Sequence, residues 1–127
     1  MEIGYNNKYR SQMPVTNCPP DSAKSKDLND VYRLTLNNPP KEEDFQSHIE
    51  SGRKYPPGKE CEAASVSVFK DIQEASRKKK MIPAFKRHGH IVMGQIKAST
   101  GVVSESTVTS HVDWWIYRGQ TVHHLFK

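Results

Sequence analysis

Three residues near the C-terminus could do chemistry together because they share one face of an expected strand. In the segment TVTSHVDWWIY (107–117), His111, Asp113 and Trp115 alternate with apolar residues, and successive side chains of a strand point to opposite faces. One face therefore carries an imidazole, a carboxylate and an indole, which stacks well on planar groups. We predict a ligand-contacting surface here, although a partly covered sheet face would explain the same pattern.

The six histidines raise the alternative of a metal site. His88 and His90 would share one face of a strand, and neutral imidazole nitrogens bind zinc at about 2.0–2.1 Å. The pair His123 and His124, and His111 near Asp113, are the other sources. The sequence has no HExxH and no CxxC motif, and its histidine pairs depend on the fold to meet. We therefore expect no metal.

Nucleophilic catalysis is not favoured by the spacing. Ser110 and His111 are adjacent, so on a strand their side chains point to opposite faces and cannot form a dyad. Cys61 has no orienting His or acid nearby in the sequence, and there is no GxSxG motif.

A basic cluster supplies much of the net charge of +5; its members are Arg77, Lys78, Lys79, Lys80, Lys86 and Arg87. Cations at the end of a helix complement the helix dipole, which is the structural interpretation. The cluster could also steer anions such as nucleic acid, a dinucleotide or a phosphorylated substrate. Single-stranded nucleic-acid binding would combine these cations with exposed rings, but the chain has no RNP-like motif, KH loop or zinc finger.

The elements that position these residues are a mixture of helices and strands. Strands are expected at 30–36, 63–69, 91–98, 102–103, 107–117 and 121–126, the last two forming a hairpin, and helices at 41–51 and from 71 to about 80, ending before Pro83. In the first strand, Arg33 would point away from an apolar core face formed by Tyr32, Leu34 and Leu36. This order predicts an α+β fold with a small, mostly antiparallel, twisted sheet and two short helices.

Residues 1–29 are polar and lack periodicity, so we expect a disordered or loosely docked tail before a single domain at 30–127. Tyr5, Tyr9 and Met13 could dock on that domain. The two cysteines, Cys18 and Cys61, form no disulfide framework, which favours free thiols and a cytoplasmic location, with a Cys18–Cys61 bridge as the alternative. No apolar run reaches the ~18–20 residues of a membrane helix and no signal peptide is visible. We expect no membrane contact and a monomer or homodimer.

Four short motifs within residues 30–100 carry a family resemblance. They are VYRL with Arg33, DFQSHIESG, SVSVFKDIQEA and RHGHIVMGQIKA. In their order they resemble the first strand, the helix ending in Gly, the Ser-bearing strand with its helix, and the following Gly-preceded strand of compact ADP-ribosyltransferase-like families. These families include RNA 2′-phosphotransferases and RES-type NAD-degrading toxins.

The resemblance implies that NAD is the cofactor. Arg33 would hold a phosphate or ribose through its planar guanidinium, Ser65 or Ser67 would position the nicotinamide end, and Trp115 would contribute its ring. Breaking the N-glycosidic bond creates positive charge on the ribose, which a carboxylate stabilises.

The catalytic acid of these families is harder to place in this chain. They often carry a Glu or another polar residue on a late strand, where residues 102–126 offer only Glu105 and Asp113, neither in a convincing motif. His111 could serve instead. The implied activity, ADP-ribosyl transfer or NAD hydrolysis, is therefore less supported than binding.

The sequence thus predicts a domain that binds NAD or a related nucleotide, provided that Arg33 and His111 reach a shared pocket. The alternative is a non-enzymatic basic module that binds nucleic acid or a protein partner. A metal-dependent enzyme built on the histidines is a third interpretation.

Overall fold

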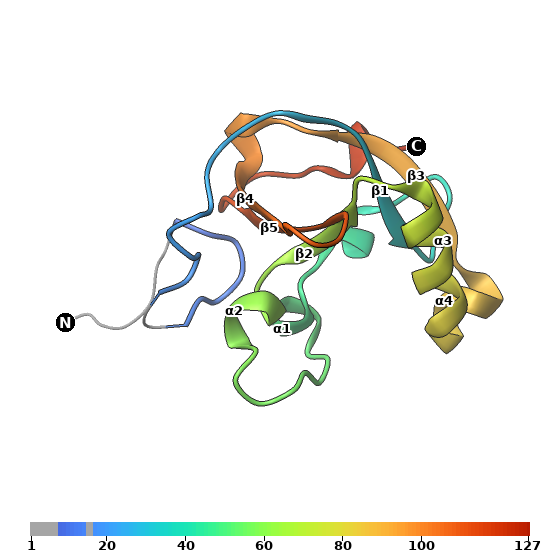
Figure 1. Ribbon diagram of the computed structural model, residues 1–127, viewed down its shortest axis with the longest axis horizontal. Helices are drawn as coiled ribbons and strands as arrows, with labels where there is room; N and C mark the ends of the chain where they lie inside the picture. The colour runs from blue at the N-terminus through green and yellow to red at the C-terminus, as the bar shows by residue number, and fades with distance from the viewer. Residues whose placement is uncertain (1–7, 15–16) are drawn as a thin grey trace.

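Five antiparallel strands form one sheet at the centre of the molecule (Figure 1). The computed structural model describes residues 8–14 and 17–127. Within them the strands lie in the order β3-β1-β2-β5-β4 and are β1 Leu28–Thr35, β2 Val66–Phe69, β3 His90–Ile96, β4 Gly101–Glu105 and β5 His111–Ile116. The helices are α1 His48–Ser51, α2 Glu60–Ala63, α3 Ile72–Met81 and α4 Pro83–His88, with 3-10 turns η1 Glu42–Phe45, η2 Ala98–Thr100 and η3 His123–Leu125. The predicted α+β class with an antiparallel sheet is confirmed.

The helix predicted at 41–51 is divided into two pieces. Gln46 is extended and separates η1 from α1. Ser47 then begins α1 through a capping box, in which its hydroxyl accepts from the Glu50 amide and the Glu50 carboxylate accepts from the Ser47 amide. This reciprocal pairing satisfies two amides at the start of the helix. Gly52 ends α1 in the left-handed conformation, at φ 72°, as the sequence predicts.

Two further helices were not predicted. Residues 60–63 form α2, so β2 begins at Val66, three residues later than expected. Pro83 follows α3 as predicted, but it also opens α4, because proline suits the first turn of a helix. Asp71 caps α3 by accepting from the Gln73 amide, whereas Glu74 accepts from the distant Ser110 amide instead of completing a capping box.

The hairpin predicted between 107–117 and 121–126 is wrong. Residues 123–125 form η3, and Phe126 bridges to Gly94 of β3. Phe126 lies so close to Gly94 that an added Cβ would stand 2.3 Å from the Leu125 carbonyl oxygen, which requires glycine there. The apolar residues of the C-terminal segment therefore cover the sheet rather than extend it.

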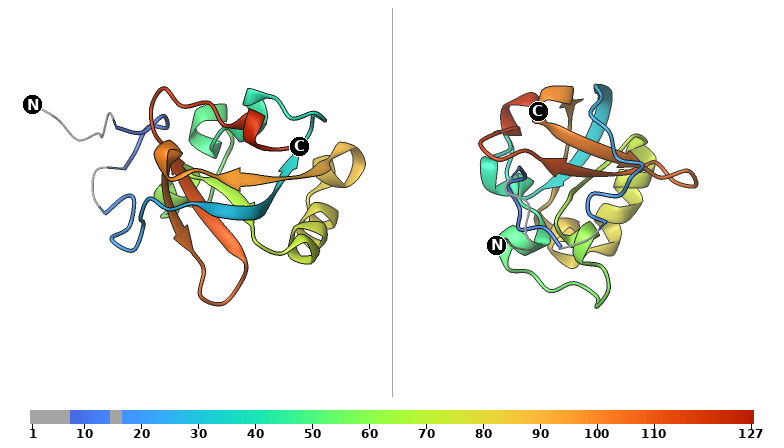
Figure 2. Two further views of the ribbon diagram at one scale, coloured as in Figure 1. Left: turned by 90° about the horizontal axis from the view of Figure 1, so that it is seen from above. Right: turned by 90° about the vertical axis from the view of Figure 1, so that its left-hand side faces the viewer.

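One face of the sheet carries the main core. The C-terminal segment and η1 lie side by side on it (Figure 2), with the rings of Phe45 and Phe126 4.9 Å apart. Its buried members are Val31, Phe45, Val66, Val68, Val92, Ile96, Val103, Val112, Trp114, Ile116, Val122 and Phe126. The core face of the first strand is thus that of Val31, while Leu36, expected to face the core, is 49% exposed. Arg33 pairs with Val92 of the main core and lies over Phe45, so the expectation that it points away from the core is wrong.

The other face of the sheet is covered in two separate places. Helices α3 and α4 pack on Leu34 and Phe69 at one end. At the other end, α1, α2 and the N-terminal segment pack around Trp115 and Ala64. Between these two coverings the face carries the polar side chains of β2 and β5, and this is where the candidate site lies.

The N-terminal segment is held to the domain by a disulfide. Cys18 bonds to Cys61 of α2, with the Cα atoms 5.5 Å apart, so the expectation of two free thiols is wrong. Tyr9 and Met13 are buried against the same region, whereas Tyr5 lies outside the described residues. Disulfides are typical of oxidising compartments, so the cysteines do not support the predicted cytoplasmic location. In the described part of the chain, no helix is long and apolar enough to cross a membrane.

Candidate functional site

Arg33 joins β1, η1 and β2 at one side of the site. Its Nε and Nη2 donate to the Asp44 carbonyl oxygen at 3.0 and 2.8 Å, and its Nη1 donates to the Ser67 carbonyl oxygen at 2.7 Å. The guanidinium lies over the Phe45 ring, 5.6 Å from the ring centre. Burial, followed by repulsion from Arg53, lowers the pKa of Arg33 to about 10, so it stays cationic at neutral pH.

The side chain of Asp44 fixes the position of the Asp44 carbonyl group, to which Arg33 donates. The Asp44 carboxylate accepts from the amides of Leu36 and Lys41 and from the side chain of Asn37. These bonds fold the segment between β1 and η1 into a compact turn. Local polar residues therefore set the position of Arg33.

A hydrogen-bonded network joins β2 to β5. His111 Nε2 lies 3.0 Å from the Ser67 hydroxyl and 3.6 Å from Asp113 Oδ1. The Ser65 hydroxyl lies 2.7 Å from the Glu62 carbonyl oxygen and 3.2 Å from Asp113 Oδ1. The strand register produces this arrangement, since Ser67 pairs with Asp113 across the two strands.

This network is not a serine-protease triad. In a triad the acid bonds to one ring nitrogen of the histidine and the serine to the other. Here Ser67 and Asp113 both approach Nε2 of His111. The geometry suits an imidazole held in place by two polar neighbours, rather than one that activates a serine nucleophile.

Asp113 is largely withdrawn from solvent, with a side chain 20% exposed. Burial raises the pKa of its carboxyl, and this effect is opposed by His111 and by the hydrogen bond from Ser65. A carboxyl with a raised pKa next to an imidazole is an arrangement found at functional sites as well as in structural networks.

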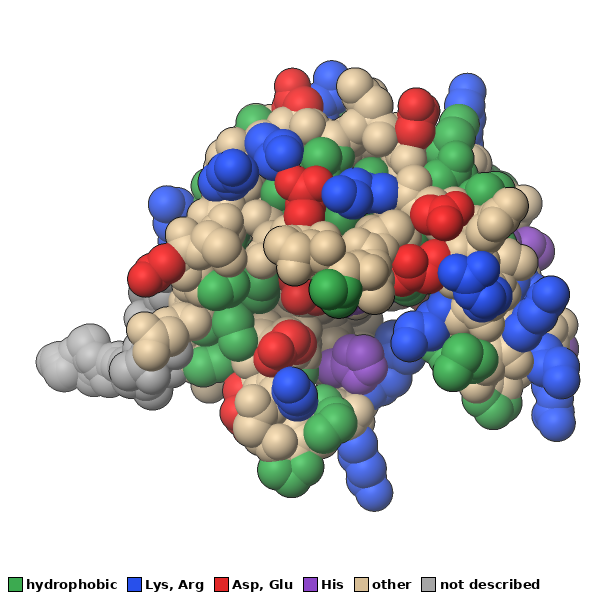
Figure 3. Space-filling model, in the orientation of Figure 1, with side chains coloured by type: hydrophobic (Ala, Val, Ile, Leu, Met, Phe, Trp, Pro, Cys, Tyr) green, Lys and Arg blue, Asp and Glu red, His purple; other side chains and the backbone are tan. Residues whose placement is uncertain are grey.

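A first cavity of about 370 Å³ opens between the two coverings of the sheet. Arg33, Ser65, Ser67 and His111 all line it, so the structure brings these four residues together. The other lining residues are Leu34, Gln46, His48, Arg53, Phe69, Lys78, Ile82 and Phe85. None of these described residues carries a carboxylate. Figure 3 shows a hollow below the sheet with His, Lys and Arg side chains around it.

A second cavity of about 340 Å³ adjoins the first. The two share five lining residues: Arg33, Leu34, Arg53, Ile82 and Phe85. The second cavity continues past Leu36 and Ala84, and two acidic residues, Glu43 and Asp44, line it. Together the two cavities form one cleft of two lobes that meet at two arginines. The cleft as a whole is lined by three cationic and two acidic side chains.

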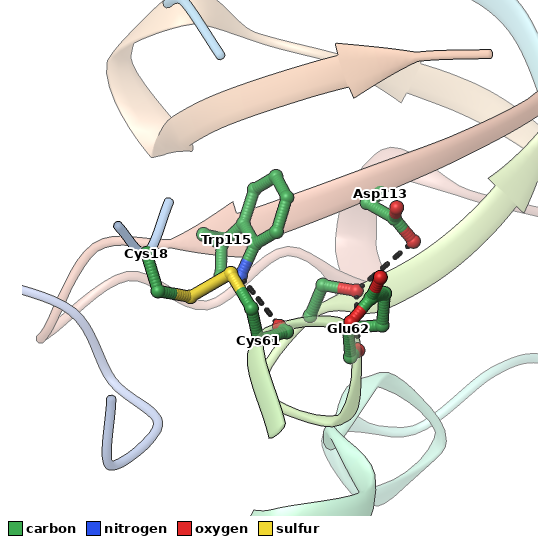
Figure 4. The surroundings of a disulfide bond; sticks show 6 residues. Cys18, Cys61, Glu62, Asp113 and Trp115 are labelled. Carbon is green, nitrogen blue, oxygen red and sulfur yellow. Dashed lines mark hydrogen bonds between the residues drawn. A yellow bond between two sulfur atoms is a disulfide. The ribbon is translucent and has the colours of Figure 1, made fainter. Parts of the chain in front are cut away.

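Three predicted site residues do not line this cleft: Asp113, Trp115 and Glu105. Asp113 is connected to the lining only through its contacts with Ser65 and His111. Trp115 shares the strand face of His111, as expected, but it is 2% exposed and its Nε1 donates to the Cys61 carbonyl oxygen beside the disulfide (Figure 4). Its ring is therefore interior packing. Glu105 pairs with Lys26 and Lys70, each at 2.8–2.9 Å, and these bonds lower the pKa of its carboxyl.

The sequence did not single out the other polar residues of the cleft. Arg53 lies between the elements predicted at 41–51 and 63–69, His48 lies within the helix predicted at 41–51, and Lys78 was one member of the basic cluster. Burial, then the charges of Arg53 and Arg33, lower the pKa of His48, so its imidazole is neutral at pH 7. Of these three residues, only Lys78 could have been found from the sequence, through its place in the basic cluster. Arg53 and His48 reach the cleft only through the tertiary fold.

In residues 8–14 and 17–127 the structure contains no group of three or more His, Cys, Asp and Glu side chains able to hold a metal ion.

The fold and the site define a small α+β domain with a cationic, two-lobed cleft on one face of its sheet. Comparisons with protein-family models, curated proteins and solved structures found no match. The resemblance to ADP-ribosyltransferase-like families stays a prediction from the motifs alone.

Proposed function

We propose that the cleft binds a dinucleotide of the NAD class. The observation that carries this proposal is that the two cavities meet at Arg33 and Arg53. A pyrophosphate at these two guanidinium groups would leave one nucleoside for each lobe. Volumes of about 340 and 370 Å³ lie within the range of small-molecule sites, about 300–1,000 Å³.

The electrostatics of the cleft favour a phosphorylated ligand. Burial is the main cause of the lowered pKa of Arg33, and repulsion from Arg53 adds to it. Lys78 adds a third cation to the first lobe. A bound anion relieves that repulsion, and guanidinium groups bind phosphate oxygens in a bidentate manner. The half-buried ring of Phe85 in the same lobe offers apolar surface to a planar base.

The catalytic extension of this proposal is ADP-ribosyl transfer or NAD hydrolysis in the first lobe. The bond between the ribose C1′ and the nicotinamide nitrogen would break, and nicotinamide would leave with the bonding electrons. An acceptor hydroxyl, or water in hydrolysis, would then bond to C1′ and give its proton to His111. Asp113 would hold the imidazole and stabilise its positive charge.

Binding is tested by calorimetric titration and thermal shift with NAD, ADP-ribose and AMP. Arg53 and Lys78 are exposed, so Arg53→Ala and Lys78→Ala should fold normally. Each is expected to weaken NAD binding at least about tenfold, because a charge-assisted hydrogen bond contributes about 1.5–3 kcal/mol. Lys97→Ala, an exposed lysine outside both cavities, is the matched control. The proposal fails if NAD does not bind or if the control loses as much affinity.

Catalysis is tested separately, by measuring nicotinamide release. The wild type should release nicotinamide from NAD, and His111→Gln should bind NAD but release nicotinamide at least about a hundredfold more slowly, as for a lost general base. Binding without release would leave the dinucleotide proposal standing and remove its catalytic extension.

A further inference from the structure

A second cationic surface continues outward from the cleft along α3 and α4. We call it the basic ridge; its residues are Arg77, Lys78, Lys79, Lys80, Lys86 and Arg87. All are exposed except Lys79, which is half-buried. Figure 3 shows Lys and Arg side chains gathered at this end of the molecule, where Figure 1 places the two helices.

The charge of the ridge is not neutralised within the described chain. None of the ion pairs in residues 8–14 and 17–127 includes a ridge residue. The carboxylate of Glu74 feels the charge of Arg77, but it bonds to the Ser110 amide. All ridge residues except Arg77 lie in the last turns of α3 and α4, where the helix dipole places only about half a negative charge at each end. Six neighbouring cations exceed what two short helices require.

We propose that the basic ridge binds the phosphate backbone of a single-stranded nucleic acid. Proteins that bind single strands combine a line of cations with rings on which bases stack. The ridge supplies the line of cations, and Lys78 connects it to the first cavity, where the half-buried ring of Phe85 also lies. A base of the bound strand would reach the cavity mouth. This goes beyond the dinucleotide proposal, since the ridge binds a strand whether or not the cleft holds NAD.

The same helices are poorly suited to a lipid surface. A helix lying on a membrane needs an apolar stripe that faces outward. On these helices Ala75, Ile82 and Phe85 face the sheet. The exposed apolar residues of α3, Ile72 at 50% and Met81 at 72%, are nine positions apart and so lie on opposite sides of the helix. The outward surface is therefore charged rather than amphipathic.

The test is fluorescence anisotropy with an oligothymidylate of about 12 nucleotides, within the usual site size of single-strand binding domains. The ridge variant is Lys80→Gln, Lys86→Gln and Arg87→Gln together, none of which lines either cavity. The control variant is Lys24→Gln, Lys59→Gln and Lys97→Gln, three exposed lysines elsewhere. Both lose the same formal charge. Circular dichroism establishes that both are folded.

Six phosphate contacts predict a slope of about −4 for the logarithm of the association constant against that of salt concentration, at about −0.7 per contact. The ridge variant should lose at least about tenfold in affinity at low salt and about half of that slope. The control variant should stay within about twofold of the wild type.

Three results would overturn the proposal. The wild type could fail to bind the oligonucleotide, the two variants could lose affinity equally, or binding could be confined to vesicles with anionic lipid or to an acidic polypeptide. NAD titration of the ridge variant separates the two proposals. Loss of oligonucleotide binding with NAD binding intact is the expected result, and oligonucleotide binding without any NAD binding would refute the dinucleotide proposal only.

Discussion

Breaking the Cys18–Cys61 disulfide is expected to lower the free energy of unfolding by up to about 4 kcal/mol. The bond closes a loop with a sequence separation of 43 residues. The chain-entropy relation for cross-links gives about 4 kcal/mol for a loop of this length at 25 °C. The perturbation is the double variant Cys18→Ala and Cys61→Ala, compared with the oxidised and the reduced wild type.

The native contacts around the disulfide should survive in this variant. Trp115 Nε1 donates to the backbone carbonyl of Cys61, which alanine retains. The N-terminal segment also bonds to the sheet through backbone pairs, from Arg10 to Ile116 and between Lys24 and Val103. The loss of stability therefore arises mainly in the unfolded chain, which gains freedom when the cross-link is absent.

Urea denaturation followed by tryptophan fluorescence measures the effect. With a slope of about 1.5 kcal/mol per molar urea, a loss of about 4 kcal/mol lowers the midpoint by about 2–3 M. Cys18→Ala alone should lose nearly as much as the double variant, because either change breaks the bond. Coincident midpoints for the oxidised and reduced wild type would refute the reasoning.

Three further substitutions test the site and its supports. Arg33→Ala should lower the unfolding free energy by about 3 kcal/mol in urea denaturation, since two backbone carbonyls lose their donor at about 1–3 kcal/mol each; Arg53→Ala, an exposed control, should cost less than about 0.5 kcal/mol. Asp113→Asn should raise the melting temperature at pH 7. The pKa of Asp113 is raised in the folded protein, so the folded state loses stability as the pH rises above 3.8, the ordinary pKa, and the carboxyl ionises. The gain should vanish in melting curves at lower pH, where the carboxyl is protonated. Glu105→Gln should cost about 0.5–1 kcal/mol above pH 4.5 and nothing in more acidic urea titrations, because the lowered pKa of Glu105 makes its ion pairs stabilising only when it is ionised.

The alternation of β5 could be read from the sequence because a strand has a strict period of two. Trp114 lies in the main core and His111 and Asp113 lie on the other face, as predicted. The burial of Trp115 could not be foreseen. It depends on α2 and the N-terminal segment, which a disulfide holds over that end of the sheet.

The first strand was harder because both of its faces are covered. Helices lie on one side of β1, and η1 with the C-terminal segment lies on the other. Apolar residues therefore occur on both faces of this strand, and they do not alternate with polar ones. Leu34 contacts the helices while Val31 lies in the main core. Likewise the apolar residues Val122 and Phe126 predicted a strand, but they pack over the main core. This packing depends on the distant Gly94, because only glycine leaves room for Leu125 and Phe126 there.

The opening in the second face of the sheet follows from the side chains of β2 and β5. Their register places Ser67 and His111 next to each other between two apolar ends. An apolar helix packed over these groups would remove their access to water, at about 1–3 kcal/mol for each polar group left without a partner. Helices therefore cover only the two ends. The position of the cleft is encoded locally by two strands, whereas its charge comes from Arg53 and Lys78, which only the folded chain brings to the rim. If this reasoning holds, Arg53→Ala and Lys78→Ala weaken the binding of NAD in calorimetric titration without unfolding the domain or closing the cleft.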